Sequence, residues 1–156
     1  MTTREYLSQI RKINLMIEAK VEDSIRLRTL ATKITVPTDG ERVKSSPDPD
    51  KLTNVVAKIV ELDREIEESV KELIKKRKII YRQIEEIENP EYYSFLIYKY
   101  TQFLQSKEIA GKMNVSKSVM FTIQAQALLE FEKKYGSEYL LPTDEREKGV
   151  KVKWDA

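Results

Sequence analysis

The sequence predicts an all-α protein that consists of a long antiparallel helical hairpin, a small helix-turn-helix region and an extended C-terminal tail. Three observations lead to this prediction. Apolar residues recur at helical spacing along most of the 156 positions. Charged residues make up 35% of the chain, which is typical of long solvated helices. The chain has only four glycines, which disfavours a fold rich in tight turns.

The first predicted helix covers residues 3–34. Thr2 and Glu5 have the spacing of a capping box, which marks a helix N-terminus. Apolar residues follow mostly at intervals of three or four, namely Tyr6, Ile10, Ile13, Ile17, Val21, Leu27, Leu30 and Ile34. The stretch TVPTDGERVKSSPDPD contains three prolines and a glycine, so it predicts a flexible linker over residues 35–50.

A seven-residue repeat marks the second predicted helix, residues 51–88. Asp48-Pro49 is a good start signal for it, and Asn89-Pro90 ends it. The repeat consists of Leu52, Ile59, Ile66, Leu73, Ile80 and Ile87, and it is widened by Val55, Val56, Leu62, Val70 and Ile84. Such a register is typical of a coiled-coil seam. Two helices alone bury little surface, so we expect the six repeat residues of this hairpin, residues 1–88, to hold a homodimer or higher homo-oligomer together.

Residues 89–135 are expected to form the helix-turn-helix region. An aromatic helix begins at Asn89-Pro90, and a short helix begins with Ser106 as its N-cap. Asn114 suits the left-handed position that ends the short helix. Ser116 then caps a last helix that we expect to end at Gly136. The tail, residues 136–156, has no sustained periodicity and is expected to be extended or disordered.

The composition excludes several functional classes. The chain contains no cysteine and no histidine, which removes disulfides, thiolate metal sites and every histidine-based catalytic triad. We therefore expect no enzyme activity, no cofactor and no metal site. The N-terminus has no apolar signal segment, and no run of residues is long and apolar enough to span a membrane. A cytoplasmic protein of a bacterial cell is the expectation that follows.

The last predicted helix has two distinct faces. One stripe should pack into the core of its own region, and it consists of Met120, Ile123, Ala127 and Phe131. The opposite face is small, neutral and partly apolar, and it consists of Ser118, Thr122, Ala125 and Leu129 with Phe121 and Gln126 beside them. No charged residue occurs between Ser118 and Leu129, although helices that read DNA usually need cations nearby for phosphate.

The sequence resembles known helix-turn-helix families. The segments EIA at 108–110, MNVS at 113–116 and AL at 127–128 have the spacing of the DNA-binding fourth region of bacterial sigma factors. The stretches REYLSQIRKINLMIEAKVEDSIRLRTLATKIT, DKLTNVVAKIVELDREIEESVKELIKKRKIIYRQIEEI and NPEYYSFLIYKY resemble a family of small phage and prophage proteins. That family is grouped with the RinA-type and ArpU-type regulators of phage late operons. The resemblance covers residues 4–134 and implies a role near transcription.

Two functions remain open at this point. In the first, the chain is a phage-type transcription regulator that binds double-stranded DNA. Lys107, Lys112 and Lys117 would then contact phosphates, while the groove would be read by Ser118, Phe121, Thr122, Ala125 and Gln126. In the second, the region has lost DNA binding and docks on protein, either RNA polymerase or a host defence protein, through Phe121 and Leu129. Relatives of the family usually carry Arg or Lys where this chain has Ser118, Thr122 and Gln126.

Overall fold

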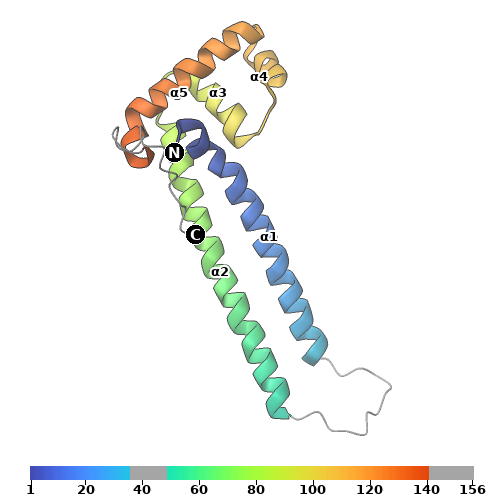
Figure 1. Cartoon of the computed structure of the whole chain (residues 1–156). Coiled ribbons are helices and arrows are strands. Elements are labelled where there is room, and N and C mark those ends of the chain that lie inside the picture. The colour runs from blue at the N-terminus through green and yellow to red at the C-terminus, as the bar shows by residue number, and fades with distance from the viewer. Residues whose placement is uncertain (36–48, 141–156) are drawn as a thin grey trace. The chain divides into compact units, whose positions relative to one another are not determined.

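The computed structural model describes residues 1–35 and 49–140, and this part of the chain is helical, which confirms the all-α prediction (Figure 1). The chain divides into two compact units. The arm unit comprises residues 13–76, and the head unit comprises residues 1–12 and 77–140 of the described chain. The head unit is thus built from both ends of the sequence, whereas the helix-turn-helix region was predicted to start at residue 89.

Helix α1, Thr3–Thr35, begins as the sequence predicts. The Thr2 amide donates to the Glu5 carboxylate at 2.7 Å, and the Glu5 amide donates back to the Thr2 hydroxyl at 3.2 Å. This reciprocal pair is the capping box, and it satisfies two amide groups that the helix itself leaves without a partner. The Thr2 amide and then the Thr2 hydroxyl, as hydrogen-bond donors to its carboxylate, lower the pKa of Glu5.

Helix α2, Pro49–Glu85, starts two residues earlier and ends three residues earlier than predicted. Proline at the first helical position fits its fixed φ angle and its missing amide hydrogen. The Asp48 cap and the linker positions 36–48 lie outside the described residues. At the other end, the Ile87 amide donates to the Ile84 carbonyl at 3.1 Å, which tightens the chain into a turn before Asn89.

In the arm unit, α1 and α2 lie side by side and run antiparallel (Figure 1). Four of the six repeat residues lie in this unit. Ile59 and Leu73 are buried, while Leu52 and Ile66 are half-buried. The other two, Ile80 and Ile87, are buried in the head unit, and Ile87 lies beyond the end of α2. Val55 and Leu62, which were predicted to widen the stripe, are exposed instead. The seam of the arm unit is therefore only partly covered within the single chain, and the predicted oligomer stays a prediction.

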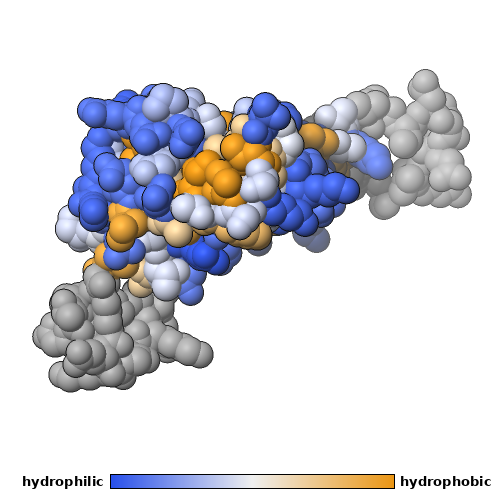
Figure 2. All heavy atoms as spheres, turned by 90° about the horizontal axis from the view of Figure 1, so that it is seen from above, coloured by the Kyte–Doolittle hydropathy of each residue, from blue (hydrophilic) through white to orange (hydrophobic). Residues whose placement is uncertain are grey.

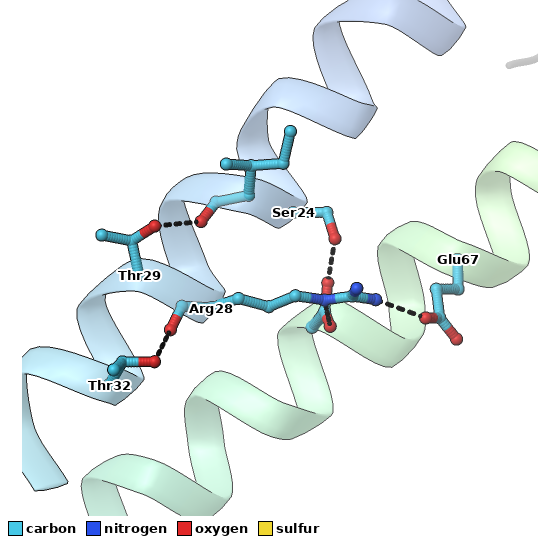
Figure 3. A network of polar contacts seen from close by, with 7 residues as sticks. Ser24, Arg28, Thr29, Thr32 and Glu67 are labelled. Carbon is cyan, nitrogen blue, oxygen red and sulfur yellow. Dashed lines mark hydrogen bonds and ion pairs between the residues drawn. The ribbon is translucent and has the colours of Figure 1, made fainter.

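A polar layer interrupts the apolar seam of the arm unit (Figure 3). Asp63 of α2 accepts hydrogen bonds from the Ser24 hydroxyl at 2.5 Å and from Arg28 at 2.8 Å. Arg28 also reaches Glu67 at 2.8 Å. The Ser24 hydroxyl and then the Arg28 guanidinium lower the pKa of Asp63, whose side chain is 16% exposed. Because the Asp63 carboxylate has specific partners on α1, these contacts favour one alignment of the two helices along their length.

The head unit holds most of the buried apolar residues of the described chain. Its remaining elements are α3, Pro90–Leu96, the π-helix η1, Ile97–Thr101, α4, Ser106–Met113, and α5, Lys117–Tyr139. The largest side chains with almost no exposure are Phe95, Phe131, Leu7, Ile10, Ile84, Leu96, Ile109 and Met120. Leu7 and Ile10 come from α1, so the N-terminal residues are part of this core.

Helix α5 continues past Gly136, where the sequence predicted its end. Tertiary contacts explain the extension, because they outweigh the cost of about 1 kcal/mol that glycine imposes on a helix interior. The ring of Tyr139 stacks on Tyr6 with 4.2 Å between centroids, and its hydroxyl lies 2.9 Å from that of Thr3. Gly136 itself is buried. The first four residues of the predicted tail are therefore helical, and residues 141–156 lie outside the described part.

Two further local predictions need correction. The aromatic helix that starts at Asn89 changes into the π-helix η1 after Leu96, and such π-turns are frequent near functional sites. Ser106 is the first residue of α4 rather than its cap. The capping position belongs to Gln105, whose side chain forms no capping hydrogen bond.

Candidate nucleic-acid interface

Helices α4 and α5 are joined by the tight turn that the sequence predicts. Asn114 adopts the left-handed conformation with φ 55° and ψ 45°. Its amide donates to the Gly111 carbonyl at 3.2 Å, and the Val115 amide donates to the Ala110 carbonyl at 3.0 Å. This pair of bonds is a Schellman motif, which ends α4 and reverses the chain. Ser116 then caps α5 by accepting a hydrogen bond from the Val119 amide at 3.2 Å.

The two faces of α5 lie as the sequence predicts. Its inner stripe is buried and consists of Met120, Ile123, Ala127 and Phe131, and Tyr135 continues it. The residues assigned to the outward face are all exposed, namely Ser118, Phe121, Thr122, Ala125, Gln126 and Leu129. Because α4 packs on α5 and α5 packs on α3, the outward face is held on a rigid support. Helix α5 therefore presents one continuous surface beyond the turn.

Two polar side chains on this outward face already have partners. The Thr122 hydroxyl donates to the Ser118 carbonyl of its own helix at 3.2 Å, and it keeps its lone pairs for another donor. The Gln126 side-chain carbonyl accepts from the Tyr92 hydroxyl at 3.2 Å. Tyr92 thereby orients the Gln126 amide, and the NH₂ group of Gln126 remains a donor for an incoming acceptor.

The three lysines assigned to phosphate contacts are exposed and lie on α4 and at the start of α5. Lys107 lies in the first turn of α4, Lys112 lies in its last turn, and Lys117 is the first residue of α5. None of them forms an ion pair with another residue that the structure describes. The Lys112 ammonium lies 5.4 Å from the centroid of the Tyr98 ring, a cation–π contact that holds it near η1. Lys112 and Lys117 therefore provide positive charge close to the N-terminus of α5, and Lys107 provides it at the other end of α4.

A further cation, beside the loop before α4, could not be found from local sequence patterns. Arg11 of α1 belongs to the head unit, and its guanidinium lies 5.9 Å from the centroid of the Phe103 ring. Phe103 has a φ of 57°, which is strained for a residue with a side chain, and it is 38% exposed in the loop before α4. Arg11 therefore adds a positive charge next to the loop that leads into the helix-turn-helix.

Apolar side chains also reach the surface of α5. Val119, Phe121 and Leu129 are 48%, 50% and 53% exposed. Figure 2, which looks down on the molecule from the side of α5, shows hydrophobic side chains gathered in a patch with hydrophilic ones around it. Exposed patches of this kind are typical of surfaces that bind a partner.

This geometry places the protein in the class of α-helical proteins that carry a rigid helix-turn-helix. The motif lies in the head unit, and the described residues form helices and their connections. The chain belongs to the family described as protein of unknown function DUF1492, whose model matches residues 40–132. Searches of curated proteins and of solved structures found no match to the chain. Among the described residues, no helix combines the length and the apolar character that a membrane crossing requires.

Proposed function

We propose that this chain is a phage-type transcription regulator that binds double-stranded DNA in the cytoplasm of a bacterial host, with α5 as the helix that enters the major groove. The observation that carries the proposal is the joint between α4 and α5, in which a left-handed Asn114 and the Ser116 cap hold α5 rigidly with its outward face exposed. Docking of the second helix of such a motif in the major groove is the common way in which this geometry binds DNA.

In the head unit, the charged residues that would bind phosphate are separate from the neutral residues that would read the base sequence. Lys107, Lys112 and Lys117 would contact phosphates on either side of the groove, and Arg11 adds to them. The outward face of α5 is neutral, so it contributes little to non-specific attraction. We therefore expect modest affinity for arbitrary duplex DNA and a shallow dependence of this affinity on salt.

Gln126 and Thr122 are the polar groups that would read base edges. Tyr92 occupies one lone pair of the Gln126 carbonyl, so the NH₂ group of Gln126 is the better placed to bind a base acceptor such as guanine O6 or N7. Gln126→Ala and Thr122→Ala should each cost about 1–3 kcal/mol at the preferred site and leave non-specific binding intact.

The test is a selection of binding sequences from a random duplex library with the full-length chain, followed by gel shifts over a range of salt concentrations. Lys107→Ala and Lys117→Ala should each reduce the slope of log affinity against log salt by about one. Lys133→Ala is the matched control, because Lys133 is exposed on the same helix but lies far from the turn. Equal slopes for all three variants would show that the turn is not where phosphate binds.

A second candidate function rests on the apolar residues of the same face. Phe121 is 50% exposed and Leu129 is 53% exposed, which suits a protein partner better than a phosphate-lined groove. In this version the head unit docks on a protein such as RNA polymerase or a host defence protein. Buried apolar anchors carry most of the energy of such interfaces, so Phe121→Ala and Leu129→Ala should each abolish the complex.

The double substitution Phe121→Ser, Leu129→Ser distinguishes the two functions in one sample. Circular dichroism first checks that the helices are intact. If DNA binding and its sequence preference persist while a purified partner is lost, the face binds protein. If DNA binding is lost together with the sequence preference, the face reads DNA, because Phe121 would lie within reach of a thymine methyl group.

A further inference from the structure

The arm unit buries little of its own apolar surface. Among its described residues, the buried apolar ones are Ile13, Ile59 and Leu73. Nine large apolar side chains of this unit are exposed, namely Leu15, Met16, Val21, Ile25, Leu30, Val55, Val60, Leu62 and Ile74. Two packed helices with so small a core are marginal by themselves, since most helix stability comes from packing of an apolar face. Of these nine side chains, Leu62 lines a groove between the two helices.

A shallow groove runs between α1 and α2 along one side of the arm unit, and its floor is apolar. Leu27, Leu62 and Ile66 form the floor. The rim contributed by α1 consists of Lys20, Asp23 and Arg26, and the rim contributed by α2 consists of Glu65 and Ser69. The α1 rim therefore carries net positive charge and the α2 rim carries negative charge.

The alignment of the two helices places oppositely charged rim residues at the same height. Ser24 bonds to Asp63 and Arg28 bonds to Glu67, each across the seam from α1 to α2 (Figure 3). Because α1 and α2 run antiparallel, these two contacts cross one another, and their common centre lies at Arg26 on α1 and Glu65 on α2. Arg26 and Glu65 are therefore level with one another on the two rims.

We propose that the groove is the docking surface for a second copy of this chain, with the two arms parallel and α1 of each copy lying over α2 of the other. A twofold axis along the arm brings the positive α1 rim of one copy onto the negative α2 rim of the second copy. Arg26 of one copy then faces Glu65 of the other. An axis across the arm would instead lay the α1 rims on each other, which places like charges together.

This arrangement also removes the apolar residues of the groove from water. The floor residues Leu27, Leu62 and Ile66 meet their counterparts, so two hairpins become a four-helix bundle with a shared core. The second copy is favoured over a lipid surface because the rim is of mixed charge rather than basic. The inference requires no DNA, so its failure and the failure of the proposed function would be separate results.

The absence of cysteine from the sequence allows a direct test with single-cysteine variants of the full chain. Arg26→Cys and Glu65→Cys are prepared separately, mixed, treated with a short bis-maleimide and run on a denaturing gel. The proposal predicts a cross-linked dimer in the mixture and little product from either variant alone. Strong cross-linking of Arg26→Cys with itself would mean that the arms are antiparallel, and a monomer in every sample would overturn the proposal.

Sedimentation of Leu62→Gln tests the apolar floor independently, without DNA. Leu62 is 39% exposed in the single chain, so the substitution should leave the hairpin intact, and circular dichroism checks this. Loss of the apolar Leu62 side chain from both copies should raise the dimer Kd by about tenfold or more. Val60→Gln is the matched control, since Val60 is 60% exposed on the same helix and does not line the groove. Equal Kd values for the two variants would contradict the assignment of this surface.

Discussion

Phe131→Ala should destabilise the head unit by about 3–5 kcal/mol, which is the usual cost of truncating a buried phenylalanine. Phe131 is 0% exposed, and its ring lies 5.1 Å from that of Tyr135 and 6.1 Å from that of Tyr6 between centroids. The substitution removes these contacts and leaves a cavity where α5 meets α1. Because small proteins are stable by only about 5–15 kcal/mol, much of the stability of the unit would be lost.

Urea unfolding followed by near-ultraviolet circular dichroism measures this loss, because that signal reports the packing of the tyrosines. Thermal unfolding should show a midpoint lowered by at least about 12 °C, at about 4–8 °C for each kcal/mol. Phe121→Ala provides the matched control on the same helix, since Phe121 is 50% exposed and its truncation should change stability by no more than about 0.5 kcal/mol. Similar losses for both variants would refute the assignment of the two faces of α5.

Three further outcomes are expected. Asn114→Ala should destabilise the head unit by about 1–2 kcal/mol because of its φ of 55°, whereas Asn114→Gly should not; equal urea midpoints would contradict this. The lowered pKa of Asp63 means that its carboxylate stabilises the arm fully above the unfolded pKa near 4, and that this contribution is lost as the pH falls through the folded pKa. Thermal unfolding of Asp63→Asn should therefore depend less on acidic pH than that of the parent chain. Arg11→Ala should weaken DNA binding in gel shifts and reduce its salt slope, while Arg64→Ala in the arm should change neither.

The sequence predicted the features of this chain that depend on neighbouring residues. The capping box at Thr2, the Asn89 and Ser116 caps and the left-handed Asn114 are all present, because each depends on hydrogen bonds within a few positions. The buried and exposed faces of α5 were predicted for the same reason, since helical periodicity decides which side chains share a face.

Features that depend on distant residues were missed. Gly136 does not end α5, because Tyr139 packs on Tyr6 from the other end of the chain. Arg11 stands beside Phe103, and no local pattern connects the two. Leu62 fitted the apolar stripe of the seven-residue repeat, yet the pairing of α2 with α1 leaves it on the flank. In each case the outcome was decided by packing between elements rather than by the preference of one segment.

The two-part origin of the head unit has a consequence for synthesis on the ribosome. Tyr6 is synthesised well before Phe131, the residue of α5 whose ring it contacts in the head unit. The hairpin can pair before α5 exists, while the head unit must wait until α5 has been made. Until α5 is made, a nascent chain carries the apolar residues of the first twelve positions without the rest of their core, so chaperones that bind emerging chains would meet this segment uncovered.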